Sequence, residues 1–143
     1  MKDESSPITP DEFVIRLIWA EYYKPKLAEV VRERAFKPRD DEVTGISVFR
    51  ASCLAKPADA LAVMAPEKRA KYALALLPVA EILSLGLTVR GAKIEKVPGH
   101  AVIPELNSMV LIEDLPKYKD AFKQLARIAA RNLIPPEFRD EAS

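Results

Sequence analysis

His100 is the only histidine in the chain, and it stands in the segment Val97-Pro98-Gly99-His100-Ala101-Val102-Ile103. Proline and glycine favour a turn, and the β-branched residues that follow favour a strand. The segment therefore predicts an imidazole at the first position of a strand. Because histidine is the side chain that ordinarily changes charge near neutral pH, His100 is the first candidate for a catalytic acid or base.

Ser47 supplies a hydroxyl that could act with His100, and Asp40 or Asp41 would complete a Ser-His-Asp set by composition. Ser47 lacks the Gly-x-Ser-x-Gly setting that exposes a nucleophile, and spacing alone does not bring the three side chains together. A lone imidazole at the start of a strand more often makes a local hydrogen bond at the edge of the core. The sequence favours that second interpretation.

Metal and phosphate-loop chemistry lack their usual residues. No second histidine is present, and a single cysteine, Cys53, excludes a zinc site built on several thiolates as well as an intramolecular disulfide. Gly86, Gly91 and Gly99 are too far apart to form a phosphate-binding loop. We therefore expect no metal and no cofactor, a buried structural role for Cys53, and a reducing compartment.

Several other residues are candidates for binding. Arg16 and Arg50 each interrupt an apolar strand pattern, where an arginine either grips an anion in a bidentate manner or simply faces solvent. Residues 24–45 predict a long charged loop that carries Phe36, Asp40 and Asp41. Such a loop is either a partner-binding surface or a solvated connection.

A basic stripe is predicted on the last helix, where Lys119, Lys123, Arg127 and Arg131 recur at intervals of four. Such a stripe can meet the backbone of a nucleic acid. The same helix also carries Asp120, and its outer face has to be polar in any case. A solvated face is therefore the favoured interpretation, with nucleic acid as an alternative partner.

Composition points to one ordinary globular domain in 143 residues. Lys and Arg number 22 against 21 Asp and Glu, so no overall charge attracts nucleic acid or an anionic membrane. No apolar run approaches the roughly 20 residues that a membrane span needs, and the first residues lack the apolar core of a signal peptide. We expect a cytoplasmic protein without a membrane partner, with flexible residues 1–8, one domain over 9–138 and flexible residues 139–143.

The elements that must position these residues predict an α+β fold. We expect a small mixed sheet of about four to five short strands, with a long amphipathic C-terminal helix packed on one face. Apolar and β-branched runs predict strands over 13–19, 45–50, 72–77, 87–89 and 101–103, and short helices are predicted over 57–64 and 78–86. Helical spacing from Leu115 to Leu133 predicts the last helix, capped by Asp114 and ended by Pro135-Pro136. The segment Thr9-Pro10-Asp11-Glu12 fits a helix capping box or a turn, and we expect the turn.

Four short motifs follow one another along the chain: Phe36-Lys37-Pro38 with Asp40 or Asp41 after it, Gly45-Ile46-Ser47-Val48, Leu85-Gly86-Leu87-Thr88-Val89, and Pro98-Gly99-His100-Ala101-Val102-Ile103. In this order they resemble a family of small uncharacterised bacterial proteins that share Phe-x-Pro, Gly-Leu-Ser-Val, Pro-x-His-Ala-x-Ile and an alanine-rich last helix. The resemblance implies a small α+β domain in which His100, Ser47 and Phe36 recur, and a place in bacterial conflict or antiviral defence loci. The resemblance implies no particular activity for this chain. The chain departs from the pattern at Val14-Ile15-Arg16, where a more polar strand with paired arginines is expected, and this weakens an anion-binding role for Arg16.

Two functional hypotheses follow. The first, favoured because reactive side chains are scarce, is a non-catalytic accessory module that binds another protein through residues 24–45 and the strand edges. The second is a small enzyme or toxin that acts on a nucleotide or nucleic acid with His100 as acid or base, in a cleft lined by Ser47, Arg50 and the Asp40-Asp41 pair. The second hypothesis requires His100 to be partly exposed in a concave pocket and within hydrogen-bond reach of a partner group.

Overall fold

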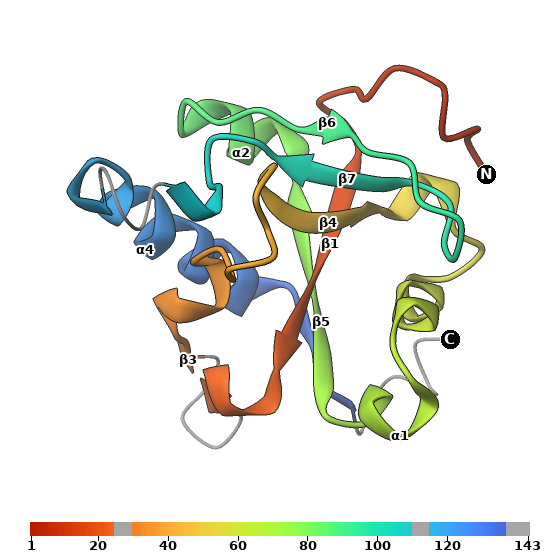
Figure 1. Cartoon of the computed structure of the whole chain (residues 1–143), viewed down its shortest axis with the longest axis horizontal. Coiled ribbons are helices and arrows are strands. Elements are labelled where there is room, and N and C mark those ends of the chain that lie inside the picture. Colours follow the sequence, from red (N-terminus) through yellow and green to blue (C-terminus); the bar gives the residue numbers. More distant parts are fainter. Residues whose placement is uncertain (25–29, 110–114, 137–143) are drawn as a thin grey trace.

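The structure, a computed structural model that describes residues 1–24, 30–109 and 115–136, confirms the α+β class. A six-stranded sheet in the order β6-β7-β4-β1-β5-β8 carries the long helix α4 on one face (Figure 1). Its strands are β1 (Phe13–Trp19), β4 (Ile46–Arg50), β5 (Tyr72–Pro78), β6 (Arg90–Gly91), β7 (His100–Ile103) and β8 (Leu133–Ile134). All its pairings are antiparallel, so the sheet has slightly more strands than predicted and is not mixed.

The remaining elements are short. A second sheet pairs β2 (Tyr23–Lys24) with β3 (Val30–Val31). Besides the long α4 (Leu115–Arg131), the helices of the described residues include α1 (Pro66–Arg69), α2 (Val79–Ser84) and the 3-10 helices η1 (Ala20–Tyr22), η3 (Glu33–Phe36), η4 (Ala51–Cys53) and η5 (Pro57–Val63). Every helix in the part of the chain that the structure describes is too short or too polar to span a lipid bilayer.

The central strand β1 forms as its β-branched residues predict. The Glu12 N–H donates to the Thr9 carbonyl at 3.1 Å, which confirms a turn rather than a helix start at this point. β1 then pairs with β5 along its whole length, from Phe13 opposite Pro78 to Trp19 opposite Tyr72. This pairing gives the sheet a continuous centre on which both cores are built.

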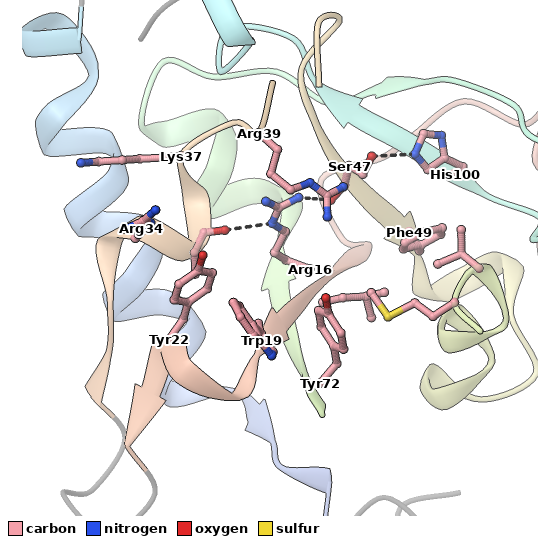
Figure 2. Close-up of a pocket in the computed structure, with 14 residues that line it drawn as sticks. Arg16, Trp19, Tyr22, Arg34, Lys37, Arg39, Ser47, Phe49, Tyr72 and His100 are labelled. Carbon is pink, nitrogen blue, oxygen red and sulfur yellow. Dashed lines mark hydrogen bonds between the residues drawn. The ribbon is translucent and has the colours of Figure 1, made fainter. Parts of the chain in front are cut away.

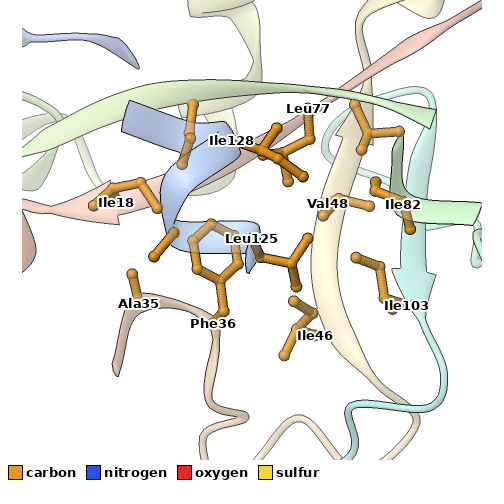
Figure 3. Packing of buried hydrophobic residues seen from close by; sticks show 14 of the residues in the cluster. Ile18, Ala35, Phe36, Ile46, Val48, Leu77, Ile82, Ile103, Leu125 and Ile128 are labelled. Atoms are coloured by element: carbon orange, nitrogen blue, oxygen red, sulfur yellow. The ribbon is translucent and has the colours of Figure 1, made fainter. Parts of the chain in front are cut away.

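The main core lies between the sheet and α4. Leu125 and Ile128 on the helix lie in one buried cluster with Ile46 and Ile103 of the sheet (Figure 3), and Phe122 and Ala129 belong to the same cluster. A second cluster on the opposite face joins Ile15 and Phe49 to apolar residues of the 54–63 segment. Both faces of the sheet are therefore covered near its centre, as expected when the strands are almost entirely apolar.

Three predicted elements differ from the structure. Helix α4 ends at Arg131, because Leu133 pairs with Ala75 in β8 instead of completing another helical turn. Residues 87–89 form no strand, since Glu105 takes the Thr88 N–H and hydroxyl and so replaces a ladder partner. The helix predicted over 57–64 is the 3-10 helix η5. The predicted cap Asp114 and the predicted flexible end 139–143 lie outside the described residues.

The segment predicted as a loop over 24–45 is largely structured where it is described. It contains β3 and η3, and it buries Phe36 completely in the core beneath α4 (Figure 3). Phe36 was predicted to contact a partner, and its 0% exposure corrects that role. The Phe36 ring packs in the core, whereas its charged neighbours Arg34 and Lys37 reach the surface.

Arg50 is also an interior residue, so its predicted role as a ligand-binding or solvent-facing arginine is wrong. Its side chain is 1% exposed and donates to both Glu12 carboxylate oxygens, at 2.9 and 3.0 Å. The same guanidinium donates to the Ser6 and Pro7 carbonyls at 2.8 and 3.2 Å. Arg50 therefore holds the N-terminal segment against the edge of the core.

Glu12 is held in its charged form by this cluster. Burial raises the pKa of its carboxyl, but hydrogen bonds from Arg50, the Ser52 hydroxyl and the Thr9 N–H outweigh burial and lower the pKa from 4.5 to about 2. A pKa below its unfolded value stabilises the fold at pH values above 4.5, and that stabilisation is lost as the pH falls from 4.5 towards 2.

We predict that Glu12→Gln lowers the free energy of unfolding at pH 7 by about 3 kcal/mol, because it leaves the buried Arg50 without a counter-charge. Urea denaturation measures the loss. The variant should also show a flatter stability profile between pH 4.5 and pH 2 than the parent protein. Glu21→Gln, at an exposed position, is the control, and equal stability of the two variants at pH 7 would contradict the prediction.

Candidate functional site

A cleft of about 600 Å³ opens beside the sheet where β1 and β4 separate (Figure 2). The two strands pair only at Val14 opposite Arg50 and Ile15 opposite Phe49. The cleft is lined by Arg16, Leu17, Trp19, Tyr22, Arg34, Ala35, Lys37, Arg39, Ser47, Phe49, Val63, Met64, Tyr72 and His100. It therefore gathers side chains from both halves of the chain, including three candidates from the sequence, Arg16, Ser47 and His100.

The separation of the strands is filled by an ion pair. Continuing the register of β1 and β4 would place Leu17 opposite Ser47, yet the Ser47 N–H donates to Glu42 Oε2 at 2.8 Å and the Ser47 carbonyl accepts from Arg16 Nη1 at 3.0 Å. Arg16 and Glu42 thus take the two backbone groups of Ser47 that a strand partner would otherwise take. Ser47 therefore has a strand partner on one side only, Val102 of β7, and its other side is free of strand pairing at the cleft.

The Arg16–Glu42 pair is buried and fully hydrogen-bonded. Arg16 Nη1 lies 2.9 Å from Glu42 Oε2, and Arg16 Nε donates to the Ala35 carbonyl at 3.1 Å. Burial raises the pKa of Glu42, but the charge and hydrogen bonds of Arg16, with the N–H groups of Arg39 and Ser47, outweigh burial and lower it. Arg16 is therefore neither solvent-facing nor free to grip an external anion with its whole guanidinium, which corrects both alternatives drawn from the sequence.

Ser47 and His100 meet because of the geometry of the β4–β7 pair. Ser47 lies opposite Val102, and His100 is two residues from Val102 on the same face of β7, so the two side chains are diagonal neighbours. Ser47 Oγ is 3.1 Å from His100 Nε2. The imidazole is half-buried and packs at 5.3 Å from the Phe49 ring.

The other imidazole nitrogen determines which proton His100 carries. His100 Nδ1 lies 2.5 Å from the Ala92 carbonyl oxygen, which can only accept a hydrogen bond, so Nδ1 is the protonated nitrogen. In the neutral ring Nε2 then has a free lone pair and accepts the Ser47 hydroxyl proton. This is the arrangement of a nucleophile beside its general base, with a backbone carbonyl orienting the ring.

The turn before His100 is confirmed. Gly99 has a φ of +82°, and a Cβ built there would lie 2.6 Å from Cys53 Cβ. Only glycine fits both the backbone angle and the space. Cys53 is buried, as its neighbours predict, and its side chain helps to fix the turn that delivers His100.

The predicted aspartates do not join the pair. Asp40 and Asp41 are both exposed, and Asp41 is bound to Arg39 Nε at 3.4 Å. The position next to His100 Nδ1, where a triad would place an aspartate, is taken by the Ala92 carbonyl. The Ser-His-Asp set suggested by composition is therefore a Ser47–His100 pair.

Sequence reasoning missed the charged and aromatic lining of the cleft. Arg34, Lys37 and Arg39 line it together with Arg16, and none of the described residues that line it is acidic. Trp19, Tyr22, Phe49 and Tyr72 supply aromatic rings. The signal available beforehand was that Arg34, Lys37 and Arg39 cluster within six residues, but nothing in the sequence pointed them at β1 and β4.

The basic stripe of α4 lies elsewhere. Its four cations, Lys119, Lys123, Arg127 and Arg131, are exposed, and none of them lines the cleft. Arg131 is paired with Glu81 at 2.5 Å. Among the described residues, no three histidine, cysteine or carboxylate side chains gather closely enough to hold a metal ion.

No protein-family model, no curated protein and no solved structure matches this chain. The resemblance to small bacterial proteins therefore depends on its short motifs alone. The functional interpretation has to come from the geometry of the cleft.

We predict that neutral His100 carries its proton on Nδ1. Long-range ¹H–¹⁵N NMR at alkaline pH tests this directly, because the chain has one histidine and gives one set of imidazole signals. Ser47→Ala should leave the proton on Nδ1, since the Ala92 carbonyl fixes it. A neutral ring protonated on Nε2 would contradict the assignment.

Proposed function

We propose that this protein is a small enzyme that carries out acid–base chemistry on a phosphate ester of a nucleotide or nucleic acid, with His100 as the acid or base. The observation that carries the proposal is the contact of Ser47 Oγ with His100 Nε2 at 3.1 Å in an open cleft lined by cations. His100 thereby meets the geometric condition set by the second sequence hypothesis, partial exposure in a concave pocket with a partner in reach.

The arrangement supports a specific order of proton movements. Ser47 Oγ attacks the phosphorus of the ester while its proton passes to His100 Nε2, the bond from phosphorus to the leaving oxygen breaks, and that oxygen takes the proton from His100. A water molecule then attacks the phosphorus of the phosphoserine and gives a proton to His100 Nε2, and Ser47 Oγ leaves with that proton, which releases the phosphate and restores both side chains. The Nδ1 hydrogen bond to the Ala92 carbonyl keeps the lone pair of Nε2 directed at Ser47. The positive side chains of Arg34, Lys37 and Arg39 stabilise the charge on the phosphoryl oxygens.

The alternative, a protein-binding accessory module, has lost one contact residue of the 24–45 segment, since Phe36 is buried. The enzyme hypothesis has lost Arg50, which was expected to line the cleft and is buried elsewhere. Asp40 and Asp41, which the enzyme hypothesis placed in the cleft, are exposed and do not line it, and neither does the basic stripe. A protein partner and a role in bacterial defence stay predictions from the sequence. The enzyme hypothesis is favoured because the cleft joins reactive, charged and aromatic groups at one place.

We predict that the purified chain converts at least one phosphate ester among the common ribonucleotides, short single-stranded RNA and short single-stranded DNA. His100→Gln and Ser47→Ala should each lower the rate by about 100-fold or more, because each removes one member of the proton-transfer pair. Chromatography of the products measures the rate, and thermal unfolding confirms that each variant folds.

Ser84→Ala is the matched control, because Ser84 is exposed on α2 and its hydroxyl donates to the nearby Glu81 carbonyl at 2.7 Å. It should retain the parent rate. No product from the parent protein with any of the three substrate groups would overturn the proposal. Full activity in the folded His100→Gln variant would also overturn it.

A further inference from the structure

We infer that the cleft binds a single nucleoside phosphate unit, with the base against Trp19 and Tyr22 and the phosphate on Arg34, Lys37 and Arg39. The unit is a free nucleotide or one unpaired nucleotide of a single strand, which share this chemistry. The inference takes its substrate class from the proposed function. It concerns recognition alone and does not require turnover.

The size of the cleft limits the ligand. At about 600 Å³ it lies in the range of small-molecule sites. A paired duplex keeps its bases inside the helix, so none of its bases can enter such a cleft unless it is first unstacked. The ligand that fits is a mononucleotide or an exposed, unpaired base.

The aromatic edge of the cleft suits a planar base. Trp19 ends β1 with 38% of its surface exposed, and its ring meets Tyr22 edge to face at 5.8 Å. Tyr72, opposite Trp19 in the β1–β5 pair, adds a further ring to the same edge (Figure 2). Exposed aromatic rings beside cationic groups are typical of proteins that stack unpaired bases.

The cationic edge suits the phosphate. Figure 2 shows Arg34 and Lys37 near Tyr22 and Arg39 nearer to Ser47, all of them away from Tyr72. Arg39 is connected to Ser47 through Glu42, whose carboxylate lies 3.5 Å from Arg39 Nε and accepts the Ser47 N–H at 2.8 Å. Arg39 and the backbone of Ser47 therefore contact the same carboxylate.

The basic stripe of α4 is the rival anion-binding surface. It presents cations from Lys119 to Arg131 but contributes none to the cleft and lacks the aromatic rings found there. A surface of that kind binds polyanions without regard to their bases. The two surfaces therefore predict different ligand preferences.

The fluorescence of Trp19 reports on the cleft alone, because the chain contains one tryptophan. We expect saturable quenching by at least one of the four ribonucleoside 5′-monophosphates, with the matching nucleoside and inorganic phosphate each binding at least about tenfold more weakly. Isothermal titration calorimetry measures the same affinities independently of fluorescence. A single-stranded RNA hexamer, included as a separate arm, distinguishes a free nucleotide from one within a strand by which of the two binds more tightly.

Two sets of variants test the contacts. The double variant R34Q/K37Q should weaken the monophosphate at least tenfold while leaving the nucleoside unchanged, and Trp19→Leu should weaken both about fivefold or more by calorimetry. The double variant K119Q/K123Q on α4 is the matched control and should bind the monophosphate like the parent. No binding of any monophosphate, equal binding of inorganic phosphate, or an effect of K119Q/K123Q as large as that of R34Q/K37Q would each overturn the inference.

Failure of this inference is distinguishable from failure of the proposed function. The variants His100→Gln and Ser47→Ala should retain binding, so binding without turnover in the parent protein would contradict only the enzyme proposal. Turnover in a protein whose affinity is insensitive to Trp19, Arg34 and Lys37 would contradict only the recognition inference.

Discussion

The buried ion pair between Arg16 and Glu42 is the interaction on which the rest of the site depends. Together they occupy the N–H and carbonyl of Ser47, the groups that a continuous strand pairing would use. A closed β1–β4 ladder would leave no cleft between these strands. Two buried charges are stable here because each is compensated by the other and by backbone hydrogen bonds from the segment before β4. The cost of interrupting the sheet is thus offset locally, and Ser47 stays accessible.

A second buried pair, Arg50 with Glu12, works in the same way at the other end of the β1–β4 contact. This second pair binds the N-terminal segment, whereas the Arg16–Glu42 pair keeps two strands apart. Both strand arginines therefore have structural roles, and the cations of the 34–39 segment are the ones for which we propose recognition of an external anion. That segment is itself fixed by Phe36, whose burial beneath α4 holds η3 at the side of the cleft. The packing of Phe36 in the core therefore also fixes the position of the cleft wall that η3 forms.

The reactive pair shows how few groups the arrangement needs. One imidazole is oriented by a backbone carbonyl, and one hydroxyl is delivered by the diagonal register of two antiparallel strands. No carboxylate is required to keep the His100 proton on Nδ1, because the Ala92 carbonyl accepts a hydrogen bond from that nitrogen. The scarcity of catalytic residue types, which favoured a non-catalytic module from the sequence, is compatible with a site of this kind.

The sequence by itself determined the elements whose signals are local: the central strands, the turn at Gly99, the amphipathic face of α4 and the burial of Cys53. It placed His100 at a strand start but could not bring it to Ser47, which lies 53 residues away. Only the tertiary structure decided that Arg16 is interior, because a charged residue in an apolar strand has the same local pattern whether it faces water or a buried partner. Its partner Glu42 comes from a separate segment 26 residues away, and that pairing depends on how the strands separate, which is a property of the packed sheet and not of any stretch of sequence.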